Sequence, residues 1–311
     1  MIEQLTSLLS DYTFQLVALG TGFLGLLSGV IGTYATLRKE SLLGDALSHA
    51  ALPGIAIGFL FIGRKEWIVL MIGAAVSGLF ATFLIQWMSR KNVVKFDSAL
   101  SLILSSFFGL GLVLLTYIQD QPNANQAGLD NFIYGQASSM LLSDVRMISI
   151  IGIVLLVLVG VFWKEFKVFT FDPVFTQTAG FSSSILQFLL STMMVLVIIL
   201  GLESVGVILM SALVIGPSVA ARQWTDRLSG VMGLAGVFGF FSGVIGTILS
   251  SLGKQIPTGP TIVLVMSVFV VFSLFFAPNR GLIRKYISQK KQQQMYKKQM
   301  ELKKEGKEYA G

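Results

Sequence analysis

The sequence predicts an all-α fold, a polytopic membrane bundle of eight or nine transmembrane helices. Hydrophobic residues make up 54% of the 311 residues and charged residues only 13%, whereas a soluble domain carries roughly a quarter charged residues. The mean hydropathy is +0.76. The apolar residues also gather in successive runs, each close to the ~20 residues that a helix needs to cross a bilayer.

Four apolar runs precede a polar loop at residues 119–144. They cover approximately residues 14–37, 41–62, 67–88 and 99–118. Five more runs follow the loop, at approximately residues 145–162, 185–202, 204–220, 228–252 and 261–276. A re-entrant segment among them would reduce nine spans to eight. We therefore expect a transmembrane domain at residues 1–280 and a basic tail at residues 281–311.

The basic residues predict the orientation of the bundle, because cytoplasmic loops carry an excess of Lys and Arg. An N-terminus outside the cell puts the basic tail and most basic loop residues in the cytoplasm. These loop residues are Arg38, Lys39, Arg90, Lys91, Lys95, Lys164, Lys167, Arg222 and Arg227. We expect the N-terminus outside and the C-terminus in the cytoplasm.

Several classes of function are excluded by composition and by missing motifs. The chain has no cysteine, which rules out disulfides, thiolate metal sites and cysteine nucleophiles. It has one histidine, so a His-Glu-x-x-His zinc motif is impossible, and no phosphate-binding loop of the Gly-x-x-x-x-Gly-Lys-Ser/Thr type is present. The net charge of +7 lies in short loops and the tail, so we expect no nucleic-acid partner.

Asp45 and His49 are the strongest candidates for chemistry. They lie four residues apart in an apolar run, which puts them on one face of a helix. An ionisable group at membrane depth is costly and is therefore a functional candidate. A carboxylate with an imidazole suits manganese, zinc or iron. The alternative is an internal pair that stabilises the bundle without binding an ion.

Two side chains cannot complete a metal shell. Asp97 and Glu203 are further candidates, but both lie near the ends of predicted spans, where a charged residue needs no ligand role. A symmetric dimer would supply a second Asp45 and His49 at a shared axis. An incomplete shell also suits transport, because a closed shell would trap the ion.

Pro53 follows His49 by four residues and has no N–H to donate to the His49 carbonyl. We expect Pro53 and Gly54 to break the helix beside the Asp45–His49 pair and to loosen its backbone.

Residues 171–180 predict a two-turn helix at the cytoplasmic surface. Asp172 is a good N-cap with Pro173 at the first helical position, and Gly180 is a good stop. Such a helix is either a connector or a docking element for a cytoplasmic partner.

The sequence Ser-Gly-Val-Ile-Gly-Thr occurs at residues 28–33 and again at residues 242–247. The predicted spans that carry it run in opposite directions, as in the inverted repeats of transporters. The simpler interpretation is that small residues let membrane helices pack closely.

The run Ser-Leu-Leu-Gly-Asp-Ala-Leu-Ser-His-Ala-Ala-Leu-Pro-Gly at residues 41–54 resembles the signature of the ABC-3 family, the membrane permeases of bacterial manganese/zinc (and iron) ABC importers. Further matching motifs follow in the family's order. They are residues 96–98, 129–135, 171–173 ending at 180, 212–222 and 257–263. The resemblance extends to about residue 280, and the basic tail departs from it.

The resemblance implies a transport subunit in the bacterial cell (inner) membrane rather than an enzyme. Its partners would be a second copy of the permease, two cytoplasmic ATP-binding subunits that hydrolyse ATP, and an extracytoplasmic metal-binding protein. Asp45 and His49 would contact transported Mn²⁺ or Zn²⁺, with no permanently bound cofactor. The helix from Phe171, Asp172 and Pro173 to Gly180 would couple the permease to the ATPase.

Two alternatives remain open from the sequence. One is a proton-coupled secondary transporter or channel in which Asp45 and His49 relay protons. The other is an importer of iron chelates or a cobalamin-like cofactor, which would need no metal ligand from the protein. The sequence does not separate manganese from zinc, because both accept nitrogen and oxygen ligands.

Overall fold

The computed structural model describes residues 10–90, 94–121, 132, 135, 137, 140–252, 256–286, 289–290, 292–293 and 295–296. The side chains of Arg90 and Glu203 lie outside this description, as do most of the predicted tail at 281–311 and most of the motif at 129–135. The division into a transmembrane domain and a tail stays a prediction.

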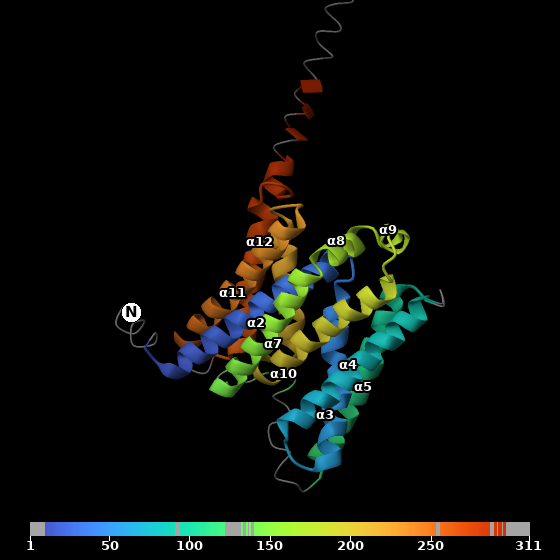
Figure 1. Ribbon diagram of the computed structural model, residues 1–311. Helices are drawn as coiled ribbons and strands as arrows, with labels where there is room; N and C mark the ends of the chain where they lie inside the picture. The colour runs from blue at the N-terminus through green and yellow to red at the C-terminus, as the bar shows by residue number, and fades with distance from the viewer. Residues whose placement is uncertain are drawn as a thin grey trace, which may run out of the picture.

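The described part of the chain contains helices and no strands (Figure 1). In chain order they are α2 (Tyr12–Leu37), α3 (Leu42–Ile62), α4 (Trp67–Arg90), α5 (Phe96–Gln119), α7 (Leu142–Val161), α8 (Trp163–Phe171), α9 (Pro173–Thr178), α10 (Ser183–Arg222), α11 (Leu228–Leu252) and α12 (Thr258–Phe276). Within the described ranges, nine helical segments are long and apolar enough to cross a membrane. The predicted all-α membrane bundle is confirmed, while the orientation of its termini stays a prediction.

Helix α10 supplies two of these segments, Ser183–Leu202 and Ser204–Arg222. The chain bends at Gly206, near the start of the second segment, where φ is 79° and ψ is 167°, a region that essentially only glycine occupies. A Cβ atom on Gly201 would lie 2.1 Å from Met210 Sδ, although residues nine apart in a straight helix are separated by about 13.5 Å. The bend is therefore sharp, and the two predicted spans are distinct.

Helices α2 and α11 pack backbone to backbone. A Cβ on Gly25 would lie 2.2 Å from the Gly239 carbonyl oxygen, and a Cβ on Gly239 would lie 2.0 Å from that of Gly25. Thr21 and Thr247 share a buried hydroxyl–hydroxyl hydrogen bond of 3.1 Å. The repeated small residues therefore act in close helix packing, as lipid-embedded helices require.

The same contacts obey a local two-fold relationship. Gly29 approaches the Ala235 carbonyl and Gly243 approaches the Thr21 carbonyl. The offset that relates Gly29 to Gly243 in the repeated motif also relates Thr21 to Ala235. The two copies of the motif thus occupy equivalent places in one helix–helix contact.

Helices α8 and α9 lie at the end of the bundle where α7 stops and α10 begins (Figure 1). Helix α8 buries Phe166 and Phe169, and the Phe166 ring meets the Tyr34 ring edge-on at 5.5 Å. The fifth span was predicted to end before this helix, and α8 was not expected from the sequence. The spacing of Trp163, Phe166 and Phe169 every three residues was the available signal for an amphipathic helix.

Candidate functional site

Asp45 and His49 lie one turn apart on α3, as their spacing predicted. His49 Nε2 is 3.5 Å from Asp45 Oδ1, a separation at the outer limit of hydrogen bonding. Ligand atoms about 2.0–2.2 Å from one ion are about 3.3–3.6 Å apart at a tetrahedral angle. The two atoms are therefore spaced as two ligands of a single ion would be.

His49 is oriented by an aromatic contact. Its ring meets the Phe108 ring of α5 edge-on, with centroids 4.5 Å apart. The other ring nitrogen, Nδ1, is buried and has no hydrogen-bond partner among the described residues. A ligating histidine usually has its second nitrogen held by an oxygen acceptor, so here Phe108 supplies the orientation.

Asp45 borders an open groove between α3, the second half of α10, and α12. The other lining residues are Leu42, Ser211, Ala212, Ile215, Gly216, Val263, Met266, Ser267, Val270 and Val271. Ser211 donates to the Ile208 carbonyl at 3.0 Å and Ser267 donates to the Val263 carbonyl at 2.8 Å. Their oxygen lone pairs remain able to accept bonds or to meet a cation.

The described residues bring no third strong ligand to the pair. Within the described residues, no group of three or more His, Asp or Glu side chains is placed to hold a metal ion. Asp97 lies in the first turn of α5, where a carboxylate complements the helix dipole. Glu203 is a residue of α10, but the structure does not describe its side chain. The described residues of one chain therefore bring together two candidate ligands, Asp45 and His49, which are called the half-site below.

The expected helix break at Pro53 and Gly54 is not found, because α3 continues through both residues from Leu42 to Ile62. Proline here removes one backbone donor without interrupting the helix, since neighbouring helices support the backbone. The Ser77 hydroxyl of α4 donates to the Ala50 carbonyl at 2.6 Å. A Cβ on Gly54 would lie 2.0 Å from the Gly73 carbonyl oxygen. Gly54 thus permits close packing of α3 on α4.

The short helix expected at residues 171–180 is present as α9. Asp172 caps it by accepting a hydrogen bond from the Phe175 N–H at 2.8 Å, and Pro173 is its first residue. Gly180 follows in the left-handed region with φ at 89°. Phe171, the last residue of α8, is exposed, as are Val174 and Phe175.

Comparisons with known proteins place the chain in a family. The model of the ABC 3 transport family matches residues 10–277. The manganese transport system membrane protein MntC of Bacillus subtilis is 46% identical over 287 residues, covering 92% of this chain and 66% of that protein. The chain thus spans slightly less than two thirds of that relative's length. The zinc transport system membrane protein TroC of Treponema pallidum is 46% identical over 282 residues, covering 91% and 95%.

The solved structure of PsaBC from Streptococcus pneumoniae in complex with Fab has the same fold. The match has a TM-score of 0.80 at 28% sequence identity and covers 93% of this chain and 100% of that chain. The family model spans nearly all the helices, and the relatives align along the same length. Both matches agree with the resemblance seen in the motif at residues 41–54. This multi-pass membrane protein belongs to the ABC 3 transport family.

Proposed function

We propose that this chain is the permease subunit of an ATP-driven importer of divalent metal ions, with manganese as the first candidate and zinc as the second. The observation that carries the proposal is the 3.5 Å spacing of His49 Nε2 and Asp45 Oδ1 beside an open groove in a chain of this family. Relatives named for manganese and for zinc transport support both candidates.

The half-site supports a homodimer. Asp45 keeps 34% of its side chain exposed, against 18% for His49, so its carboxylate lies on the open side of α3. A second copy that covers the groove would bring further ligands to the ion across a shared axis. A metal ion held by only two ligands per chain is also bound weakly enough to be released, which conduction requires.

The exposed apolar side chains at the end of α8 and on α9 support docking of an ATP-binding subunit. Phe171, Val174 and Phe175 are 56%, 73% and 56% exposed. Adjacent exposed apolar side chains of this size mark an interaction surface. With the N-terminus outside the cell, α9 faces the cytoplasm, and the metal-binding protein delivers its ion at the opposite end.

The mechanism follows from these positions. ATP binding on the partner subunits pulls α9 and so opens the dimer to the outside. The metal ion arrives from the binding protein and is held briefly by an Asp45 carboxylate oxygen and a His49 imidazole nitrogen. ATP hydrolysis then reopens the path to the cytoplasm, and the incomplete shell releases the ion.

The test is metal uptake into proteoliposomes that hold the permease with its ATP-binding subunits and binding protein. We expect ATP-dependent uptake of manganese, with zinc as a competitor, and a loss of at least about tenfold in Asp45→Asn and His49→Gln. Asp97→Asn is the matched carboxylate control and should keep uptake.

Two outcomes would support the alternatives instead. Uptake by the permease alone, driven by a proton gradient without the ATPase, would favour a secondary transporter. Uptake of an iron chelate that survives both Asp45→Asn and His49→Gln would favour a chelate importer.

A further inference from the structure

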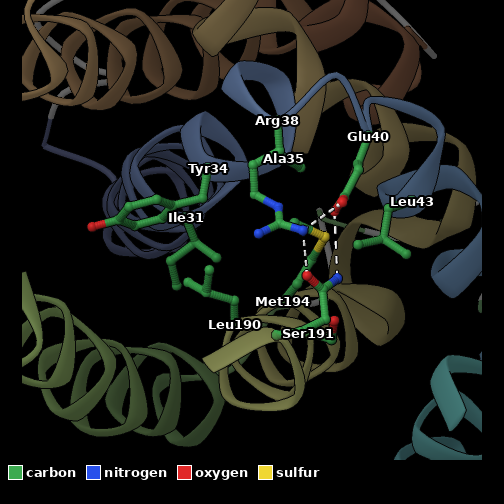
Figure 2. A pocket seen from close by; sticks show the side chains of 10 residues that line it. Ile31, Tyr34, Ala35, Arg38, Glu40, Leu43, Leu190, Ser191 and Met194 are labelled. Atoms are coloured by element: carbon green, nitrogen blue, oxygen red, sulfur yellow. Dashed lines mark hydrogen bonds and ion pairs between the residues drawn. The ribbon is translucent and has the colours of Figure 1, made fainter. Parts of the chain in front are cut away.

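Arg38 lies at the centre of a polar cluster in the turn between α2 and α3 (Figure 2). Its Nη2 donates to Glu40 Oε1 at 2.7 Å and also to Gln187 Oε1. Gln187 Nε2 in turn donates to Glu40 Oε2 at 3.5 Å. Arg38 and Glu40 each keep only 14% of the side chain exposed. Such a partly buried, mutually bonded group holds its members more firmly than a surface ion pair.

The guanidinium group also lies over an aromatic ring of a third segment. Arg38 Cζ is 4.1 Å from the centroid of the Phe169 ring of α8, within the range of a cation–π contact. Phe169 is 2% exposed, so the ring is a fixed surface. One arginine therefore joins the α2–α3 turn, α8 and α10.

These contacts bracket the short helix α9 on both sides. Phe169 precedes the cap residue Asp172 by three residues, and Gln187 lies in the first turns of α10, directly after α9. A displacement of α9 must move the chain that enters it, the chain that leaves it, or both. Either segment pulls on the same guanidinium group.

The turn that carries Arg38 and Glu40 is held to the end of α2 and to the start of α3 by backbone hydrogen bonds. The Glu40 N–H donates to the Ala35 carbonyl at 2.8 Å, and the Lys39 N–H donates to the Thr36 carbonyl at 3.3 Å. With Lys39 in the left-handed region at φ 63°, this is a Schellman motif, a defined turn at the end of α2. Leu43 N–H then donates to the Glu40 carbonyl at 3.0 Å. Glu40 is thus part of the turn that starts α3, five residues before Asp45.

The cluster also has hydrogen-bonding capacity for a second arrangement. Arg38 Nε and Nη1 are buried without a hydrogen-bond partner in the described ranges. Gln86 of α4 lines the adjoining pocket with Arg38 and Gln177 of α9. Gln86 Nε2 is likewise buried without a hydrogen-bond partner among the described residues. Buried donors left unpaired in one arrangement gain from pairing in another.

We propose that Arg38 is a positioning residue that links the coupling helix α9 to the start of α3, so that movement of α9 reaches Asp45 and His49. This inference rests on the proposed function, because it assumes that an ATP-binding subunit docks on α9. Arginine suits the role because its planar fork meets several partners at once, whereas a lysine ammonium is a point charge.

The absence of cysteine from the chain allows a single-cysteine test in the assembled importer. Val174→Cys places a thiol on exposed α9, and Ser211→Cys places one in the groove beside Asp45. The rate of modification by a membrane-impermeant maleimide is measured with and without ATP. The Val174→Cys thiol reports docking of the ATP-binding subunit, and the Ser211→Cys thiol reports opening of the groove.

We expect the ATP-binding subunit to protect the Val174→Cys thiol both in the parent chain and in Arg38→Lys. ATP should change the modification rate of the Ser211→Cys thiol in the parent chain and leave it unchanged in Arg38→Lys. Manganese transported per ATP hydrolysed should fall about tenfold in Arg38→Lys, within the range for residues along a coupling network. ATP hydrolysis itself should continue.

Arg280→Lys is the matched control, because Arg280 forms an exposed ion pair with Asp226 at 2.6 Å and is not part of the Arg38 cluster. It should leave every readout unchanged. Gln187→Met is the second variant, since it retains chain length and removes one contact of the cluster without burying a charge. It should reproduce the loss of coupling with assembly intact on gel filtration.

The outcomes separate the two proposals. An unprotected Val174→Cys thiol in the parent chain would contradict docking on α9, and with it the proposed function. A protected thiol, together with an ATP-dependent Ser211→Cys rate that survives both Arg38→Lys and Gln187→Met, would overturn the role of Arg38 alone. An ATP-independent Ser211→Cys rate in an actively transporting parent chain would overturn it as well.

Discussion

Asp45 and His49 lie one helical turn apart but meet different surroundings. The carboxylate borders an open groove, whereas the imidazole rests edge-on against Phe108 with centroids 4.5 Å apart. The carboxylate is therefore the side of the pair that an ion or a second copy can approach, and the imidazole is the oriented side. This asymmetry suits a site that is completed from outside the chain.

Metal preference should follow the imidazole. In His49→Asp the pair becomes all-oxygen, which favours hard cations and disfavours zinc. We expect manganese uptake to become about tenfold less sensitive to zinc and more sensitive to calcium, measured by competition in proteoliposomes. His49→Gln, which places an amide there, separates loss of nitrogen ligation from gain of charge. Unchanged zinc competition in His49→Asp would show that His49 does not contact the ion.

Docking of the ATP-binding subunit should depend on the cap of α9. Asp172→Ala removes the acceptor of the Phe175 N–H bond, a loss of about 1 kcal/mol, or about fivefold in the equilibrium constant between the ordered and the disordered helix. The affinity of the ATP-binding subunit for the permease should fall, by at most this factor, in a pull-down titration. Asp172→Asn keeps a side-chain oxygen acceptor and should restore binding. Equal affinities for Asp172→Ala and the parent chain would contradict this role.

The α2–α11 contact should not tolerate a side chain at Gly239. A methyl group there would lie 2.0 Å from the Gly25 carbonyl oxygen, so Gly239→Ala must separate two backbones, at about 1–3 kcal/mol. We expect a lower midpoint of thermal unfolding in detergent. Gly233→Ala on the same helix is the control, because a Cβ there meets nothing within 4 Å. It should be neutral or slightly stabilising, since alanine is the better helix former.

The bend of α10 should require glycine at position 206. Any other residue would occupy φ 79° and ψ 167° under strain of about 1–3 kcal/mol or more. Gly206→Ala should lower the yield of folded permease and its thermal midpoint. Gly160→Ala, which places a Cβ in open space on α7, is the comparison. A stable, active Gly206→Ala chain would mean that α10 can bend without glycine at this position.

The helix starts and stops were predictable because they depend on local chemistry. Asp172 followed by Pro173 predicted the capped helix α9, and the Asp172–Phe175 hydrogen bond confirms its cap. Helix α8 was missed because its charged residues, Lys164, Glu165 and Lys167, resemble the end of a span. The helix break at Pro53 was wrong because packing against α4 sustains α3 through a missing hydrogen bond.

The sequence was enough to predict the membrane class, the spans, and the spacing of Asp45 and His49, because hydrophobic runs and helical pitch are local properties. It also contained the repeated glycines, without saying which helices they would join. The tertiary structure was needed to show that Gly25 meets Gly239 and that Asp45 borders a groove. It also brought Arg38 to Gln187 across 149 residues of chain. Such pairings depend on how whole helices pack, and no local pattern specifies a contact between residues so far apart.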